Sequence, residues 1–420
     1  MAPAVVGWLR VLPAHVTHEQ TRVNGMSTEV LRWTAEEAAA PRLTPPVYFI
    51  MIPGNPGSVH FYVRYLDALY RRSNSRLNIV CVGHASHSVH SASGERYNLQ
   101  QQVAHKVAFV QRLLQDVSPG AQLVLAGHSV GAYMAVEVLR SVPVTSLHKC
   151  ILLFPTLMHI GRTVNGTSMM PLFRYFRPVA TFATRVLSWL PAPLQRAVLR
   201  VGIPEPDDAA MAAGMSLLHP NVTANTLWMA LHEMNEILHM DEAHFDAVQH
   251  KCVAYFAEQD GWVNPADVDF MEGRFSSARV IRCEEGHKHA FVLSPNSSSR
   301  LAELTWSWLE LDGAASASAG GGDVPAAQAQ HTVLAGGSTD TLDLDASTSL
   351  ASALPASAHD DTCAMPPISW QPPPSGESTV SEDHSGVHAP AAAAAALPKE
   401  AAAPAAVQHT SSVAEEDAHV

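Results

Sequence analysis

The sequence predicts an α/β protein whose mostly parallel central sheet is covered by helices on both faces. Short, continuously apolar runs alternate with longer stretches in which apolar residues recur at helical spacing. Strands that are buried on both faces show such continuous runs, and parallel strands need helical crossovers between them. The chain has 420 residues, of which 47% are hydrophobic, so it is long enough to bury a large core.

Six apolar runs are the expected parallel strands, and four stretches between or after them are the expected helices. Residues 5–33 instead resemble antiparallel edge strands, with Asn24-Gly25 as a hairpin turn. The expected strands are residues 47–52, 77–82, 123–126, 150–154, 252–257 and 279–283. The expected helices are residues 61–70, 99–115, 133–140 and 301–309.

The composition divides the chain into a body, residues 1–312, and a tail, residues 313–420. The tail is rich in Ala, Ser, Gly, Pro and His and has few large apolar residues. Such a segment buries too little apolar area to offset its chain entropy, so we expect a disordered, low-complexity extension rather than a regulatory or partner-binding segment. The tail holds 13 acidic residues and one basic residue, which leaves 26 acidic and 25 basic residues in the body.

This charge distribution and the cysteines exclude several classes of protein. Neither part has the basic patch that nucleic-acid binding requires. The five cysteines are scattered and lack CxxC spacing, so neither a disulfide framework nor a zinc site is expected, and reduced thiols in the cytosol fit better. The N-terminus lacks the pattern of a signal peptide.

A long insertion, residues 155–245, separates the fourth expected strand from the fifth. Within it, residues 169–203 combine bulky apolar residues with five arginines and are interrupted by prolines. The stretch is too broken for a transmembrane span. It fits either a helical element lying in a lipid interface or a cap over a catalytic pocket, and the two interpretations are compatible.

The strongest chemical motif is Gly127-His-Ser-Val-Gly131, which matches G-x-S-x-G between an apolar strand and a helix. A sharp strand-to-helix turn exposes the hydroxyl of Ser129, and the following helix directs its positive dipole end toward a developing negative charge. This context predicts that Ser129 is the nucleophile of an α/β-hydrolase fold.

A serine nucleophile needs a base and an acid, which follow it in the order acid, then histidine, on this fold. Asp260 lies just past the fifth strand, beside Gly261, and is the preferred acid. Glu258 is the second choice. Asp267 and Asp269 also compete, but they lie in an expected helix after Pro265, where exposed acids are ordinary.

Two histidines compete for the role of the base, because Gly286-His-Lys-His-Ala-Phe291 follows the sixth strand. His289 is preferred over His287, since it directly precedes Ala290-Phe291, an apolar pair that would anchor the loop. His84, His87 and His90 show no metal-ligand pattern, and we expect them on a solvated loop.

An oxyanion hole needs two hydrogen-bond donors. The backbone N–H of Val130 is the expected first donor. The second comes from the loop after the first central strand, Pro53-Gly-Asn-Pro-Gly57, where prolines have no N–H and the amide of Asn55 is the natural candidate. A mere tight turn is the other interpretation of this loop.

Several segments together resemble the lipid droplet-associated hydrolase family over most of residues 1–310, and the tail has no counterpart in that resemblance. The resemblance implies Ser129, Asp260 and His289 as a triad and a cytosolic protein that reaches the lipid droplet surface. It also implies hydrolysis of carboxylic esters, with sterol esters as the named substrate class. The segments are Ile52-Pro-Gly-Asn-Pro-Gly57, Phe61-Tyr62, His105-Lys-Val-Ala-Phe109, Gly127-His-Ser-Val-Gly131, Leu152-Leu-Phe-Pro-Thr156 and His289-Ala-Phe291.

We therefore expect a serine ester hydrolase that acts on neutral lipids, either sterol esters or acylglycerols, without a metal or organic cofactor. The expected partners are the lipid substrate and the droplet monolayer, with no nucleic acid and no particular protein partner. The expected locations are lipid droplets and cytosol, and an association with the endoplasmic reticulum is left open. The alternatives are a droplet-binding protein with little or no activity, or another acyl-transfer or thioester chemistry on the same fold.

Overall fold

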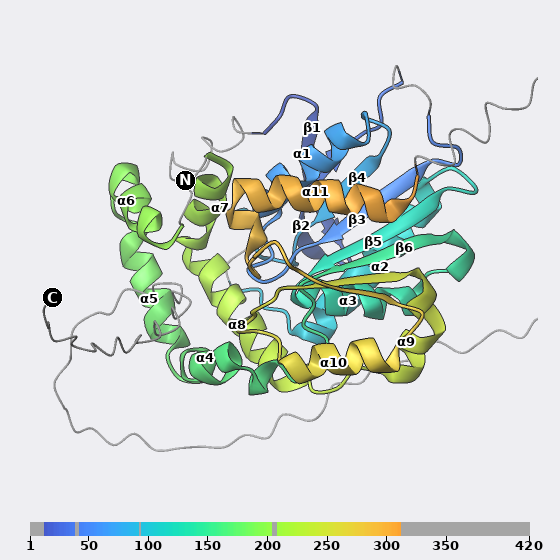
Figure 1. Ribbon diagram of the computed structural model, residues 1–420. Coiled ribbons are helices and arrows are strands. Elements are labelled where there is room, and N and C mark those ends of the chain that lie inside the picture. The colour runs from blue at the N-terminus through green and yellow to red at the C-terminus, as the bar shows by residue number, and fades with distance from the viewer. Residues whose placement is uncertain (1–11, 38–41, 92–93, 204–207, 312–420) are drawn as a thin grey trace, which may run out of the picture. The chain divides into compact units, whose positions relative to one another are not determined.

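A sheet of eight strands forms the centre of the protein, in the order β1-β2-β4-β3-β5-β6-β7-β8 (Figure 1). The six strands from β4 to β8 pair in parallel, and the hairpin β1–β2 joins β4 antiparallel. This is the expected mostly parallel sheet. The strands are β1 Val16–Val23, β2 Met26–Trp33, β3 Val47–Ile52, β4 Asn78–Val82, β5 Gln122–His128, β6 Leu147–Leu153, β7 Cys252–Phe256 and β8 Arg279–Arg282.

The computed structural model describes residues 12–37, 42–91, 94–203 and 208–311. The start of the expected edge segment, the tail at 313–420 and Cys363 lie outside the described residues, so the expected disorder of the tail stays a prediction. Cys81, Cys150, Cys252 and Cys283 are buried free thiols.

The N-terminal hairpin forms at the predicted turn. Asn24 and Gly25 have φ angles of 49° and 78°, the left-handed values that a two-residue turn with the twist of a β-hairpin requires. Strand β2 then pairs with β4 from Val30 to Trp33. The hairpin therefore extends the parallel sheet with an antiparallel edge.

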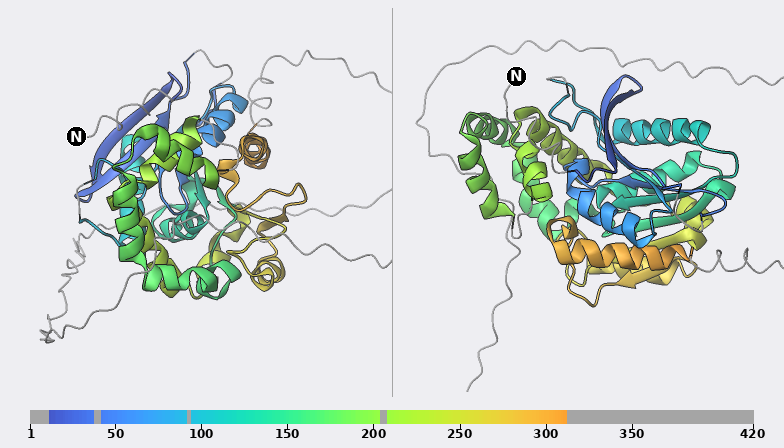
Figure 2. Two further views of the ribbon diagram at one scale, coloured as in Figure 1. Left: turned by 90° about the vertical axis from the view of Figure 1, so that its left-hand side faces the viewer. Right: turned by 90° about the horizontal axis from the view of Figure 1, so that it is seen from above.

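Helices cover both faces of the sheet, as the alternation of side chains along β5 shows. Leu123 and Leu125 belong to the core under α2, α3 and α10, whereas Val124 and Ala126 belong to the core under α1 and α11. Figure 2 shows α11 and α2 on opposite sides of the sheet. The helices are α1 Val63–Arg72, α2 Leu99–Asp116, α3 Val130–Val138, α10 Pro265–Arg274 and α11 Pro295–Leu309.

Two helices begin earlier than their apolar periodicity predicts. Helix α3 starts at Val130 rather than at residue 133, directly after Ser129. Helix α11 starts at Pro295 rather than at residue 301, because the side chain of Ser294 caps it by accepting a hydrogen bond from the Ser297 amide. The first turn of α3 contains the small residues Gly131 and Ala132, and that of α11 contains polar residues, so neither turn shows a clear apolar periodicity.

The insertion folds as a group of helices between β6 and β7, which we call the cap (Figure 2). Its helices are α4 Val164–Arg174, α5 Arg177–Leu187, α6 Ala192–Gly202, α7 Asp208–Leu217 and α8 Pro220–Glu236, and α9 Glu242–Val248 leads into β7. Pro178 and Pro193 stand in the first turns of α5 and α6, where proline is favoured. The prolines therefore divide the apolar stretch into short helices. No helix of the described residues is long and apolar enough to cross a membrane.

Candidate active site

The turn between β5 and α3 places Ser129 at the carboxyl end of the central strands. Ser129 has φ 55° and ψ −126°, a strained conformation for a residue with a side chain, and strain of this kind gathers at functional sites. A Cβ added at Gly127 would collide with the backbone of Gly131, and one at Gly131 would collide with the backbone of Ile52 and Pro53. The two motif glycines are therefore required for this turn to close.

Three residues from distant parts of the chain meet at this turn. The Nε2 atom of His289 lies 3.0 Å from the Ser129 hydroxyl, and its Nδ1 lies 2.7 Å from the Asp260 carboxylate. With the proton on Nδ1, His289 donates to Asp260 and accepts from Ser129. The structure thus brings together the three side chains that the sequence singled out as nucleophile, base and acid.

Asp260 is held so that its ionised form is favoured. Its side chain is only 5% exposed, and its second carboxylate oxygen accepts a hydrogen bond of 2.8 Å from the Trp262 amide. Burial by itself raises the pKa of Asp260, but the charge and hydrogen bond of His289 and the Trp262 amide outweigh it, and the net pKa is lowered. The carboxylate stays negative beside His289.

The competing acids are engaged elsewhere. Asp267 lies 2.9 Å from Nδ1 of His159 and accepts from Asn264. Asp269 pairs with Arg282 on the surface, and Glu258 is exposed.

The competing histidine also has other neighbours. Nδ1 of His287 lies 3.1 Å from the Ser297 hydroxyl, in the first turn of α11, and its ring is buried. Only His289 of the pair forms hydrogen bonds to Ser129 and Asp260.

His128, the variable residue of the motif, has a role that the sequence did not reveal. Its Nε2 donates to the backbone carbonyl of His289 over 2.8 Å, so its Nδ1 carries no proton and accepts from the Tyr62 hydroxyl over 2.6 Å. Burial, followed by the nearby His289, lowers the pKa of His128 to about 3, so the ring stays neutral. The Tyr62 hydroxyl in turn accepts from the Gly54 amide over 2.7 Å.

The backbone amides of the loop after β3 differ in whether they already donate a hydrogen bond. Pro53 and Pro56 have no N–H, the Gly54 amide is bound to Tyr62, and the Gly57 amide donates to the Gly54 carbonyl over 2.7 Å. A Cβ at Gly54 would lie 2.9 Å from the Cβ of Ser129, so the loop packs directly against the serine. The Asn55 amide remains as the available donor among the described contacts of this loop.

The cap contacts the same loop through Glu233 of α8. The Asn55 side-chain amide donates to Glu233 over 2.9 Å and to the carbonyl of Thr226 over 3.0 Å. Glu233 is 3% exposed, and burial raises its pKa to about 8 despite the hydrogen bond from Asn55. The residues are 178 positions apart and form no motif, so nothing in the sequence indicated this contact.

The first two of the three clustered histidines contradict the expected solvated loop. His84 and His87 are 1% and 3% exposed, and His87 donates to the carbonyl of Pro56 over 2.7 Å. The segment after β4 is thus packed beneath the loop that carries Asn55, whose close approach the sequence did not indicate.

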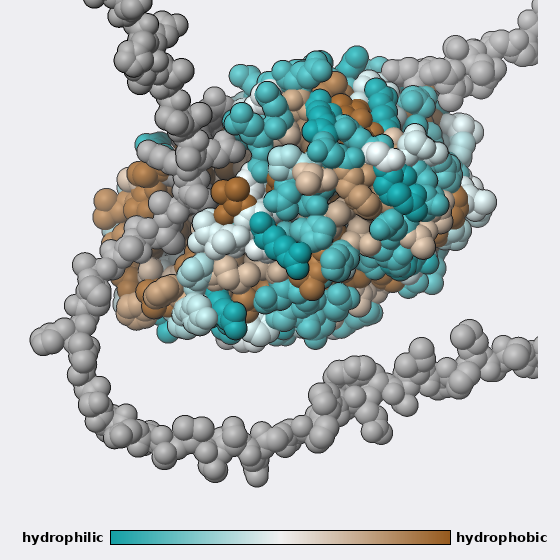
Figure 3. All heavy atoms as spheres, turned by 60° about the horizontal axis from the view of Figure 1, so that its bottom comes forward, coloured by the Kyte–Doolittle hydropathy of each residue, from teal (hydrophilic) through white to brown (hydrophobic). Residues whose placement is uncertain are grey.

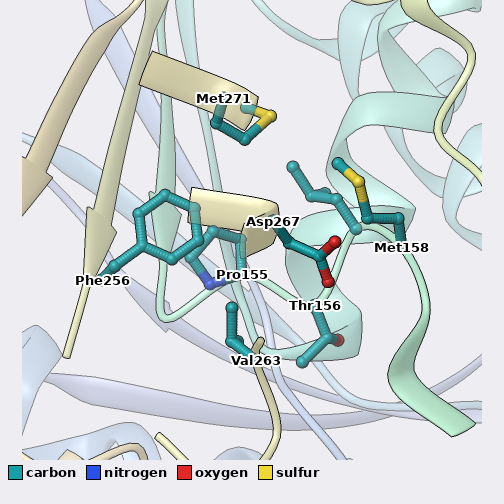
Figure 4. A pocket seen from close by; sticks show the side chains of 8 residues that line it. Pro155, Thr156, Met158, Phe256, Val263, Asp267 and Met271 are labelled. Atoms are coloured by element: carbon teal, nitrogen blue, oxygen red, sulfur yellow. The ribbon is translucent and has the colours of Figure 1, made fainter. Parts of the chain in front are cut away.

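A small apolar pocket adjoins the turn of Ser129. Figure 4 shows the side chains of Phe256, Val263 and Met271 around those of Thr156 and Asp267. The amide of Thr156 lies 3.5 Å from the Ser129 carbonyl. The hydroxyl of Thr156 is buried without a hydrogen-bond partner among the described residues.

The outer helices of the cap, α4–α6, carry an exposed apolar surface, which we call the cap surface. Trp189, Tyr175 and Phe182 are 75%, 66% and 64% exposed. Figure 3 shows hydrophobic residues gathered at the end of the molecule where α4, α5 and α6 lie. The three helices carry five arginines and no acidic residue. The surface consists of Val164, Tyr175, Phe176, Val179, Phe182, Val186, Trp189, Leu194, Val198 and Val201.

The strand order, the strained serine at the β5–α3 turn and the cap between β6 and β7 define the class as an α/β-hydrolase. The chain belongs to the lipid-droplet associated hydrolase family, whose model matches residues 45–292. It is 28% identical to the lipid droplet-associated hydrolase of Gallus gallus over 69% of this chain and 93% of that protein. The human protein of the same name is 27% identical over 67% of this chain and 91% of the relative, and the Drosophila melanogaster protein is 26% identical over 64% and 91%.

Solved structures agree on the fold. A putative lipase from Acinetobacter baumannii superimposes with a TM-score of 0.52 at 12% identity, over 73% of this chain and 98% of that one. A haloalkane dehalogenase from Bradyrhizobium elkani superimposes with a TM-score of 0.51 at 14% identity, over 71% and 99%. A lipase and a dehalogenase share this architecture, so the fold alone does not decide which bond is hydrolysed.

Proposed function

We propose that this hydrolase cleaves carboxylic esters of neutral lipids, sterol esters or acylglycerols, at the surface of lipid droplets. The observation that carries the proposal is the continuous hydrogen-bonded arrangement of Ser129, His289 and Asp260. It gives a weak nucleophile a base within hydrogen-bonding distance and gives that base a buried carboxylate.

The reaction begins when the Ser129 oxygen attacks the ester carbonyl while His289 takes the hydroxyl proton. Asp260 keeps the imidazole oriented and stabilises its positive charge. The amides of Val130 and Asn55 donate hydrogen bonds to the tetrahedral oxyanion, which forms at the N-terminus of α3. The proton then passes from His289 to the leaving alcohol, and the acyl group remains on Ser129.

Water completes the cycle. His289 removes a proton from a water molecule, the resulting hydroxide attacks the acyl carbonyl, and the second tetrahedral intermediate releases the carboxylic acid as His289 returns the proton to Ser129. The chain's own side chains account for every proton transfer in this sequence.

The cap supports a lipid as the substrate and the droplet as the location. Its exposed aromatic residues lie beside five arginines without any acid, a combination suited to a polar–apolar lipid boundary, where apolar side chains enter the acyl region and cations meet headgroups. The cap also reaches the loop beside Ser129 through Glu233. A helix group that contacts both the lipid surface and the catalytic loop would deliver an ester from one to the other.

Labelling with a fluorophosphonate probe tests the activated serine directly. The full-length protein is labelled beside Ser129→Ala and His289→Ala, with circular dichroism to establish that each variant is folded. We expect labelling of the wild type alone. A folded wild type that resists the probe both in buffer and with lipid droplets present would overturn the proposal.

The substrate class needs a second measurement. Dispersed cholesteryl ester, triacylglycerol and a short-chain thioester are offered to wild type and Ser129→Ala, and the released acid is quantified. We expect Ser129-dependent release from the neutral-lipid esters. Release from the thioester alone would assign another acyl chemistry to the same residues.

The exposed cap surface also favours a second candidate function, a droplet-binding protein with little catalytic activity. Droplet binding by the cap surface does not require Ser129. If Ser129→Ala supports the same droplet content in cells as wild type, while removal of exposed cap residues abolishes both targeting and the effect on droplets, the binding function is the principal one.

A further inference from the structure

A cluster of two histidines and a glutamate lies outside the catalytic triad, where the N-terminal hairpin meets the turn that follows the Asn55 loop. His18 belongs to β1, Glu29 to β2, and His60 to the short helix η3, Val59–Tyr62. The side chains of Glu29, His60 and His18 are 6%, 8% and 12% exposed. The proposed ester hydrolysis uses none of them.

The two histidine Nε2 atoms converge on the same oxygen of Glu29. Nε2 of His18 lies 2.9 Å and Nε2 of His60 lies 3.2 Å from Oε1 of the carboxylate. The side-chain nitrogen of Gln20, the cross-strand neighbour of Glu29, lies 3.0 Å from that oxygen. Three nitrogen atoms thus surround one carboxylate oxygen.

Hydrogen bonding alone accounts poorly for this convergence. One carboxylate oxygen offers two lone pairs, yet it faces three nitrogen atoms. The Gln20 nitrogen also lies 3.4 Å from Nε2 of His18. If both nitrogens donate to Glu29, these two donors face each other at that distance. An unprotonated Nε2 on His18 removes the conflict, and so does a Gln20 amide turned so that its oxygen faces the cluster.

We infer that His18, Glu29 and His60 form a binding site for a divalent transition-metal ion, with Zn²⁺ the best match. Zn²⁺ binds imidazole nitrogen and carboxylate oxygen at about 2.0–2.2 Å in tetrahedral geometry, which places neighbouring ligand atoms about 3.3–3.6 Å apart. The nitrogen–oxygen distances of 2.9 and 3.2 Å are a few tenths of an ångström shorter, so a small outward movement of the rings would admit the ion, and the three ligand atoms all lie within 4.8 Å of one another.

Gln20 can complete the donor set of this site. A turned Gln20 amide would add a neutral oxygen, and its other neighbour, the Ser88 hydroxyl at 3.2 Å, can donate to that oxygen as well as accept from a nitrogen.

The position of the site suggests a structural role. The ion would join both strands of the edge hairpin to η3, and η3 also carries Tyr62, which bonds to the Gly54 amide and to His128. Metal binding would thereby stabilise the segment beneath the catalytic turn without touching the substrate.

Zinc binding by the full-length protein tests the inference. The purified protein is stripped with a chelator, and Zn²⁺ is titrated in competition with a chromophoric chelator, for wild type, His60→Ala, Glu29→Gln and the control His15→Ala. His15 pairs with a single carboxylate, that of Asp67 at 2.7 Å. This control therefore measures how much zinc binding is lost when an ordinary histidine of the same segment is removed. Thermal unfolding is recorded with and without Zn²⁺.

We expect one tight equivalent in wild type and in His15→Ala. His60→Ala and Glu29→Gln should lose it, with affinity lowered by more than about a hundredfold, since losing an outer partner alone costs about 10- to 100-fold. Zinc should raise the Tm of wild type and His15→Ala by several degrees and leave the Tm of His60→Ala and Glu29→Gln unchanged. Glu29→Gln keeps the size and most hydrogen bonds of the cluster, so it serves if His60→Ala does not fold. No tight equivalent in wild type, or an equivalent retained by folded Glu29→Gln, would overturn the inference.

Discussion

The turn that carries Ser129 and the cap surface differ in the kind of side chain that they bury and expose. At the turn, polar side chains are buried and paired: Asp260 is 5% exposed and His289 13%, and each forms the hydrogen bonds that fix its orientation. On the cap surface, large apolar side chains are exposed, as Trp189 is at 75%. Under the proposed function the difference corresponds to two tasks, because chemistry needs preorganised dipoles whereas lipid contact needs exposed apolar area.

The turn is the region where a single atom should matter most. Asp260→Asn keeps the shape of the side chain but favours the wrong proton arrangement on His289, and we expect kcat to fall by about 10⁴-fold. The Tm should change little, because the amide can still accept from the Trp262 amide. Ester hydrolysis under saturating soluble substrate measures the effect.

Asp267→Asn is the matched control, since Asp267 is the rival acid and is bonded to His159 instead. It should retain near wild-type kcat. A larger loss of kcat in Asp267→Asn than in Asp260→Asn would show that Asp267, and not Asp260, is the acid of the triad.

The sequence predicted the strands and the residues of the triad, but not the contacts that support them. Continuous apolar runs indicated the parallel strands, because strands covered on both faces have no polar side to display. Ser129, Asp260 and His289 could each be placed because they lie in the segments that follow β5, β7 and β8. Their signals are local, and the sheet brings the strand ends together.

The supporting contacts have no such local signal. Glu233 lies in a cap helix and contacts Asn55 across 178 positions, and His128 stands at a motif position open to any residue. The buried His84 was misjudged for the same reason, since only tertiary packing shows what covers the segment after β4. Sequence reasoning therefore found the residues tied to strand ends and missed those positioned by long-range packing.

The contact between cap and turn can be broken at Glu233. Glu233→Ala removes the side chain that holds Asn55, and we expect kcat to fall by about 10- to 100-fold, less than the roughly 10²–10³-fold that loss of an oxyanion donor itself costs. Glu233→Gln keeps an acceptor for the Asn55 amide and should retain most activity at pH 7. Equal activity of Glu233→Ala and wild type toward a soluble ester would contradict this role.

The same pair of variants gives a pH test with a defined sign. Because the pKa of Glu233 is raised from 4.5 to about 8, the folded state binds more protons than the unfolded state between these values. Its contribution to stability is complete below pH 4.5 and is lost as the pH rises through about 8. Glu233→Gln should therefore gain Tm relative to wild type between pH 5 and pH 8, and a Tm difference that stays constant over this range would contradict the assignment.

The cap surface should respond in lipid binding rather than in chemistry. Phe182→Ser removes an exposed ring from α5, and we expect binding to artificial droplets to weaken by about 10- to 150-fold, since burying such a side chain is worth about 1.5–3 kcal/mol. Val179→Ser should weaken it several-fold. Val144→Ser, on an exposed valine outside the cap, is the matched control.

All three variants should hydrolyse a soluble ester at the wild-type rate. Droplet flotation and soluble-ester kinetics on the same preparations separate the two properties. If Val144→Ser weakens binding as much as Val179→Ser, the lipid-binding surface lies elsewhere.

Tyr62 supports the turn without contacting its reacting atoms, so we expect a smaller loss of kcat there than at Asp260 or Glu233. Tyr62→Phe removes one hydroxyl and leaves both the Gly54 amide and Nδ1 of His128 without their partner. Unsatisfied buried groups of this kind cost about 1–3 kcal/mol of unfolding free energy. We expect that loss in denaturant titration, together with only a few-fold fall in kcat, because His128 still donates to the carbonyl of His289.

Tyr65→Phe is the control for this prediction. It removes a buried hydroxyl that is bonded to Thr305 away from the turn, so it should lose stability without the change in kcat. If both variants lower kcat equally, the fall reflects general destabilisation. The hydrogen bonds that connect Gly54, Tyr62, His128 and the carbonyl of His289 would then not position the base.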